Sequence, residues 1–86
     1  MTPNAQALLC SMRDNPDKHM CATIDNLKRK QAAGDYDRAR AWFLIWNNVR
    51  DGAKRYAVTV QNKREITTAL LAHIETTHLA RKQSYG

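Results

Sequence analysis

The segment AHIETTH, residues 72–78, comes nearest to a metal-binding motif in this chain. In the zinc protease motif HExxH, two histidines four residues apart share one helix face and bind one ion. His73 and His78 are five residues apart, which places them about 140° apart around a helix. Glu75 follows His73 as in the zinc deaminases, but the PCxxC segment that completes that motif does not occur. We therefore expect no metal ion here and interpret His73 as a histidine at the edge of the core.

Catalysis by a nucleophile is not predicted either. Cys10 and Cys21 have His19 near them in the sequence, but nothing indicates the positioned base and oxyanion hole that a cysteine nucleophile requires. Asp35 and Asp37 would point to opposite sides of a helix, so they cannot act as a paired acid and base. The chain also lacks the glycine-rich motifs that bind phosphate. We expect no enzyme and no cofactor. We interpret both cysteines as reduced, small core residues of a cytoplasmic protein, and the alternative is a disulfide between them.

Positive charge is the most informative chemical feature. The 86 residues contain 14 Lys and Arg against 8 Asp and Glu, a formal net charge of +6. This balance favours nucleic acid or an acidic protein surface as partner. If the helices pack as antiparallel neighbours, we expect the basic helix ends near residues 30 and 63 on one side of the bundle. The candidate binding residues are Lys28, Arg29, Lys30, Lys54, Arg55, Lys63 and Arg64.

The segment Gln61–Arg64 begins a predicted helix with side chains that donate hydrogen bonds to phosphate or to base edges. Recognition helices of helix-turn-helix proteins begin in a similar way. The alternative is that Asn62 only caps the helix and that Lys63 and Arg64 are solvated. Cations in a first turn face the positive end of the helix dipole, which is slightly unfavourable for stability and so favours a role in binding.

Aromatic and apolar residues suggest a second kind of surface. Trp42 and Trp46 are four residues apart on an apolar helical stripe, which is typical of a core. Phe43 lies at the edge of this stripe and Leu44 on the opposite side of the helix. Phe43 and Leu44 are therefore the candidate contact residues for a protein partner or a second copy of the chain.

Four helices are predicted to position these residues, at about 3–13, 16–33, 35–61 and 63–81, in an all-α bundle. Each begins at a residue whose side chain accepts hydrogen bonds from helix amides, and Asn62 with Glu65 fits a capping box. Gly34 ends the second helix in a left-handed conformation, and residues 82–86 form a frayed tail. The predicted N-caps are Thr2, Asn15, Asp35 and Asn62.

The third helix is predicted to be long and aromatic. Asp51-Gly52 interrupts it, but the apolar positions from Ala39 to Val60 stay within an arc of about 120°. A glycine within a helix costs only about 1 kcal/mol relative to alanine. We therefore favour one helix over residues 35–61, and the alternative is a helix followed by a strand at 56–60.

Length and composition indicate a single globular domain, 1–86, that folds and stays soluble. The longest apolar run, Ala41–Trp46, has six residues, whereas a membrane span needs about 18. The N-terminus does not resemble a signal peptide, so no membrane association is expected. Three functions remain open: binding to nucleic acid or to a complex that processes it, docking on a host enzyme or complex as a viral or plasmid type of modulator or inhibitor, and formation of a structural homodimer.

Overall fold

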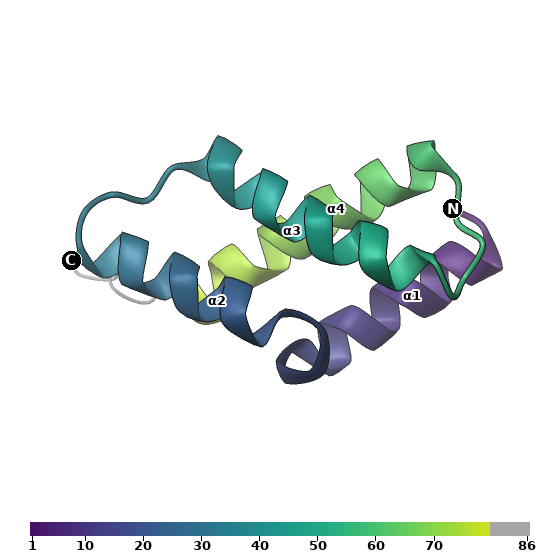
Figure 1. The fold of residues 1–86 in the computed structure, drawn as a ribbon, viewed down its shortest axis with the longest axis horizontal. Coiled ribbons are helices and arrows are strands. Elements are labelled where there is room, and N and C mark those ends of the chain that lie inside the picture. The colour runs from purple at the N-terminus through teal and green to yellow at the C-terminus, as the bar shows by residue number, and fades with distance from the viewer. Residues whose placement is uncertain (80–86) are drawn as a thin grey trace.

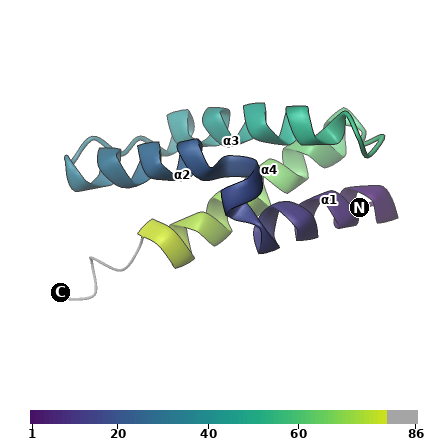
Figure 2. The same cartoon turned by 60° about the horizontal axis from the view of Figure 1, so that its bottom comes forward.

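The computed structural model describes residues 1–79, most of which lie in four α-helices. Helices α2 and α3 form one layer, and α1 and α4 form the other (Figures 1 and 2). The predicted all-α bundle of about four helices is confirmed, whereas the predicted end of the fourth helix at 81 and the tail 82–86 lie outside the described residues. The helices are α1 (Pro3–Asp14), α2 (Pro16–Ala32), α3 (Arg38–Ala53) and α4 (Val60–Ile74), followed by a π-helical turn, η1 (Glu75–Leu79).

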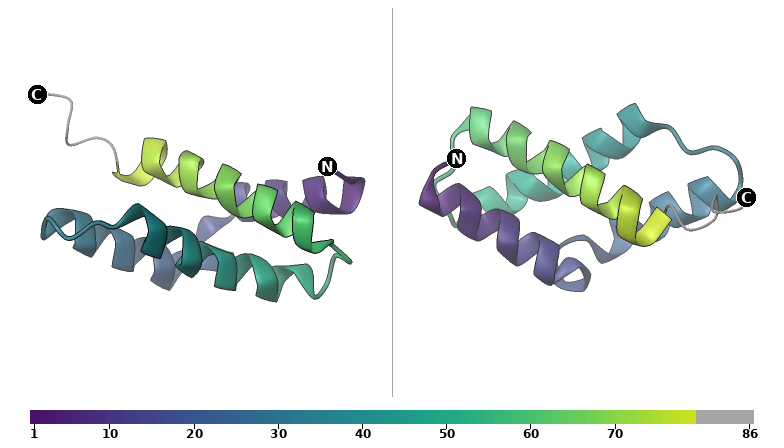
Figure 3. Two further views of the ribbon diagram at one scale, coloured as in Figure 1. Left: turned by 90° about the horizontal axis from the view of Figure 1, so that it is seen from above. Right: turned by 180° about the vertical axis from the view of Figure 1, so that it is seen from behind.

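The hydrophobic core lies between the two layers. Seen from behind, α1 and α4 cross in front of α2 and α3 (Figure 3). Buried side chains recur at intervals of three and four residues along each helix, as expected for amphipathic helices that share one core. The largest of these buried side chains are Leu8, Met12, Met20, Ile45, Ile66, Leu70, Leu71, Ile74 and Leu79.

Two of the predicted helix boundaries are formed as expected. Thr2 Oγ1 accepts a hydrogen bond from the amide of Ala5 at 3.2 Å and caps α1. Gly34 follows the C-terminus of α2 with φ of 78°, a conformation that glycine adopts without strain. Asn15 does precede α2, but its side chain donates to the carbonyl of Ser11 instead of capping the helix.

The third helix begins later than predicted and is capped by Asp37, not by Asp35. Asp37 Oδ1 accepts a hydrogen bond from the amide of Ala39 at 3.0 Å. The residues before Asp37 are not helical, and Tyr36 among them is half-buried and donates a hydrogen bond to Glu75 of η1. Anchoring Tyr36 on the opposite layer keeps the chain extended until Asp37.

The predicted single helix over 35–61 is wrong, and residues 56–60 do not form a strand either. Helix α3 ends at Ala53, and the next residues form turns with hydrogen bonds between residues three apart. Ala57 has φ of 52°, which reverses the direction of the chain. Val58 packs against the core while Val60 is 56% exposed. The apolar pattern of the sequence continues past the end of α3 because the turn that follows, and not a helix, places Tyr56 and Val58 against the core.

Helix α4 starts at Val60, three residues before its predicted start, and is capped by Thr59 and not by Asn62. Thr59 Oγ1 accepts a hydrogen bond from the amide of Asn62 at 3.1 Å. Asn62 is buried instead, where its Oδ1 lies 3.4 Å from the amide nitrogen of Thr2 and 3.3 Å from Thr2 Oγ1. Its Nδ2 donates to Glu65 at 2.9 Å. Asn62 thus joins the starts of α1 and α4.

Gly52, in the last turn of α3, lies next to two buried side chains of α1. A Cβ atom at this position would lie 3.0 Å from Leu8 Cδ1 and 3.8 Å from Met12 Sδ. Both neighbours are fully buried, so neither side chain is able to swing out into solvent. A Cβ atom at position 52 would therefore be tightly packed against Leu8, which favours glycine here.

Candidate nucleic-acid interface

The predicted cations form two groups at opposite ends of the molecule. Lys28–Lys30 lie near the end of α2, whereas Lys54, Arg55, Lys63 and Arg64 lie around the connection from α3 to α4 (Figure 1). The expectation that the ends near residues 30 and 63 share one side of the bundle is therefore wrong. Helix α3 separates them, because α2 leads into one end of α3 and α4 leaves from the other.

The outward face of α3 carries a row of exposed residues that we call the outer stripe: Arg40, Phe43, Asn47, Arg50 and Lys54. The intervals of three and four residues place all five on one helix face. The stripe contains three cations and no carboxylate. Asp51, beside it, lies 3.7 Å from Lys54 Nζ. Within residues 1–79, no carboxylate lies within 4 Å of the guanidinium groups of Arg40 and Arg50.

The exposures of Phe43 and Leu44 are the reverse of those predicted. Phe43 is 63% exposed on the outer stripe, whereas Leu44 is half-buried and packs against the core on the side of α2. The reason is that the buried stripe of α3 consists of Ala41, Ile45 and Val49 and is not centred on the tryptophans. Phe43 and Leu44 nevertheless both line one shallow groove at the surface, with a volume of about 450 Å³.

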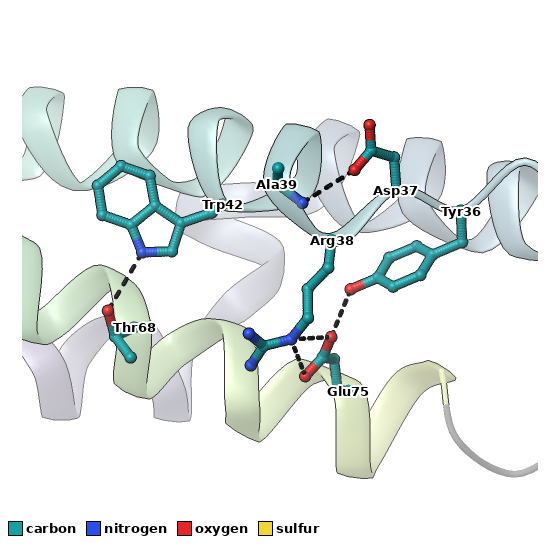
Figure 4. Close-up of polar contacts among 7 residues, drawn as sticks. All are labelled: Tyr36, Asp37, Arg38, Ala39, Trp42, Thr68 and Glu75. Carbon is teal, nitrogen blue, oxygen red and sulfur yellow. Dashed lines mark hydrogen bonds and ion pairs between the residues drawn. The ribbon is translucent and has the colours of Figure 1, made fainter.

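Trp42 and Trp46 are both half-buried and not part of the buried core that was predicted for them, although Trp42 packs against that core. Their rings stack with centroids 5.5 Å apart and an interplanar angle of 11°. Trp42 Nε1 donates to Thr68 Oγ1 at 3.1 Å (Figure 4), and the edge of Phe43 meets the Trp42 ring with centroids 6.1 Å apart. Three aromatic rings therefore form a continuous cluster that leads from the contact with α4 to the outer stripe.

Polar contacts also join the start of α3 to η1. Tyr36 Oη donates to Glu75 Oε2 at 2.7 Å, and Arg38 Nε donates to both oxygens of that carboxylate at 2.9 and 3.1 Å (Figure 4). Burial, and then the hydrogen bond to Glu75, raise the pKa of Tyr36 well above its ordinary value, because both favour the neutral hydroxyl that donates to the carboxylate. These contacts hold α3 against the second layer and so orient the outer stripe.

The four predicted cations around the α3–α4 connection are close in the fold but do not share one surface. Lys54 belongs to the outer stripe. Arg64 is exposed one turn before Thr68 on α4, and antiparallel packing therefore places it level with Trp46, which lies one turn after Trp42. Lys63 is half-buried, and Arg55 lines a cavity on the side of α2.

The cysteines and His73 lie at partly or fully exposed positions. Both cysteines are free, but Cys10 is half-buried and Cys21 exposed, so the predicted place of both in the core is wrong. His73 is half-buried, as expected at the edge of the core. Among residues 1–79, no three His, Cys, Asp or Glu side chains lie close enough together to hold a metal ion. None of the helices in this part of the chain is sufficiently long and apolar to span a membrane.

Comparison with known protein families, curated proteins and solved structures found no match to this chain. The candidate interface therefore rests on the geometry of the outer stripe and its neighbours. Three of its residues, Arg40, Asn47 and Arg50, were not among the candidate residues predicted from the sequence. Their spacing relative to Phe43 and Lys54 is visible in the sequence, but it becomes informative only when the buried face of α3 is known.

Proposed function

We propose that this protein binds nucleic acid through the outer stripe of α3 and the adjacent start of α4, without catalysing a reaction. The observation that supports this proposal is the composition of the stripe, which combines three cations, an exposed aromatic ring and an amide on one helix face. Phosphates attract the cations, and an exposed ring stacks on any base. The amide of Asn47 donates and accepts hydrogen bonds, as recognition of base edges requires.

The dimensions of the stripe suit a nucleic acid. Arg40 and Lys54 are 14 residues apart, which corresponds to about 21 Å along a helix. This distance equals the rise of about six nucleotides in one strand of a duplex. Arg50 lies between them, so the cations meet a polyanion at several points along its length. The pair of Lys54 with Asp51 is solvent-exposed and contributes little stability, so it does not oppose this contact.

The test is the salt dependence of binding, measured by fluorescence anisotropy with labelled single-stranded and duplex oligonucleotides. If Arg40, Arg50, Lys54 and Arg64 each neutralise one phosphate, log affinity should fall with log salt with a slope of about −3.6 for a duplex and about −2.8 for a single strand. The absence of binding at low ionic strength would exclude the proposal.

A matched pair of double variants tests whether the stripe is the contact surface. Arg40→Gln with Arg50→Gln should reduce the slope by about half, because two of four phosphate contacts are lost. Arg29→Gln with Lys30→Gln removes the same charge at the far end of α2 and should leave the slope unchanged. Equal weakening by both pairs would mean that only net charge matters and would contradict the assignment of the stripe.

A protein partner is the second candidate, supported by the exposed ring of Phe43. This side chain and Leu44 border the shallow groove described above, and an exposed aromatic residue of this kind is typical of a contact with another protein. The substitution Phe43→Ser distinguishes the two candidates in a pull-down from the native host with and without nuclease. Capture that resists nuclease and is lost in Phe43→Ser favours a protein partner, whereas capture that nuclease abolishes favours nucleic acid.

A further inference from the structure

A cavity of about 290 Å³ lies between α1, α2 and the end of α3, on a different side of α3 from the outer stripe. Neither the sequence motifs nor the proposed nucleic-acid interface accounts for it. Polar and charged side chains from three helices and the turn after α3 converge on this cavity. Those that carry the inference are Ser11, Lys18, His19, Asp51, Arg55 and Tyr56.

A kink in α2 brings one wall of the cavity into position. Met20 has non-helical dihedral angles, φ of −141° and ψ of 21°, so the turn Pro16–His19 has a different direction from the rest of the helix. His19 Nε2 consequently lies 3.0 Å from Ser11 Oγ on α1, within hydrogen-bonding distance. The opposite wall comes from the turns after α3, which carry Arg55 and Tyr56.

Positive charge dominates the cavity. Burial of the ring, and then the positive charges of Lys18 and Arg55, lower the pKa of His19. Asp51 is the one carboxylate among the residues lining the cavity, and its Oδ1 lies 3.7 Å from Lys54 Nζ. The imidazole is therefore neutral at neutral pH, and the two cations exceed the single carboxylate by one charge.

We propose that this cavity binds a phosphate dianion, either inorganic phosphate or the phosphate group of a small phosphomonoester, between Lys18 and Arg55. Ser11 Oγ and His19 supply additional hydrogen bonds to the bound oxygens. The volume lies at the lower end of small-molecule pockets, about 300–1,000 Å³, so it suits a compact anion and not a strand of nucleic acid. The site is separate from the outer stripe, and the inference does not depend on the proposed nucleic-acid binding.

Binding of the dianion is coupled to protonation of His19. The titratable and charged groups that line the cavity with His19 are Lys18, Asp51, Arg55 and Tyr56, and of these Lys18 and Arg55 act on its pKa. An anion bound between the two cations offsets their effect on the imidazole, so the pKa of His19 should rise when the site is filled. Measuring this pKa directly by NMR avoids confusion with the titration of phosphate itself, which also occurs near neutral pH.

The experiment is an amide NMR titration with inorganic phosphate at constant ionic strength, balanced with sodium chloride. We expect saturable shifts centred on Ser11, His19 and Arg55, and a rise in the pKa of His19. Arg55→Gln should weaken binding by about tenfold or more, because a charge-assisted hydrogen bond is lost. Arg29→Gln, at the far end of α2, is the matched control and should bind as the unchanged protein does. Circular dichroism verifies that both variants are folded.

Further ligands identify the source of the phosphate group. Adenosine 5′-monophosphate should bind, and adenosine, which lacks the phosphate, should not. A 5′-phosphorylated oligonucleotide is compared with its 5′-hydroxyl form and with adenosine 5′-monophosphate. If the phosphorylated oligonucleotide binds more tightly than both, the proposed site is supported and its ligand is the terminal phosphate of a nucleic acid. The inference is overturned if phosphate causes no saturable shifts at millimolar concentration, if adenosine binds equally well, if Arg29→Gln weakens binding as much as Arg55→Gln, or if the pKa of His19 does not rise.

Discussion

Replacing Gly52 with alanine should destabilise the protein, although the same change at an exposed helical position would stabilise it. Alanine gains about 1 kcal/mol of helix propensity over glycine. Here its Cβ would lie 3.0 Å from Leu8 Cδ1, and overpacking of a buried contact typically costs about 1–3 kcal/mol. Leu8 is completely buried, so relieving this contact requires a shift of packed core atoms. The expected net effect of Gly52→Ala is a loss of about 0–2 kcal/mol in the free energy of unfolding.

Urea denaturation followed by circular dichroism measures this change. Asn47→Ala, on the exposed outer stripe, is the control for helix propensity and should stabilise by about 0.5 kcal/mol. Leu8→Val lacks the Cδ1 atom, so in that background Gly52→Ala should no longer destabilise and the two changes should couple by about 1–3 kcal/mol. If Gly52→Ala stabilises the unchanged protein by as much as propensity alone predicts, the close contact between α1 and α3 is refuted.

Three further predictions concern stability. Ala57→Gly should raise the melting temperature. Alanine at φ of 52° carries a cost of about 1–2 kcal/mol, which exceeds the stability lost because glycine gives the unfolded chain more conformational entropy. An unchanged or lower melting temperature would argue against the left-handed turn. Asn62→Ala should lower the free energy of unfolding by about 1–3 kcal/mol, because the buried polar contact with Thr2 is lost; denaturation with urea gives the value, and a neutral effect would contradict it. Burial lowers the pKa values of His19 and His78 from 6.5, so the unfolded chain binds more protons below that pH. The unfolding free energy should therefore be constant just above pH 7 and fall as the pH drops toward 5.5, with a smaller fall when both histidines are replaced by glutamine.

Features that depend on neighbouring residues could be predicted from the sequence. The start of α1 at Thr2 and Pro3 is local, because the cap and the fixed φ of proline act within one turn. The end of α2 at Gly34 is local for the same reason, since only the backbone of that residue must adopt positive φ. The existence of four helices follows from such signals together with apolar residues at helical spacing.

Features of the candidate site that depend on packing could not be predicted. Ala39 to Val60 formed one apolar stripe in the sequence, but Ala39 and Ala57 are exposed, and Val60 faces solvent. Periodicity does not distinguish an apolar residue that a helix buries from one that a following turn buries. The same uncertainty shifted the expected core face of α3, which interchanged the exposures of Phe43 and Leu44.

Composition, helix caps and periodicity are properties of the chain alone, so they were enough to predict a basic chain that folds into a bundle of about four helices. Which cations share a surface depends on which helix faces the other helices cover, so it could be read only from the folded structure. The tertiary structure separated Lys28–Lys30 from Lys54, aligned Arg40 and Arg50 with the exposed ring of Phe43, and brought residues of three helices together around a cavity. A side chain becomes part of a site only when packing on the other faces of its helix leaves it exposed.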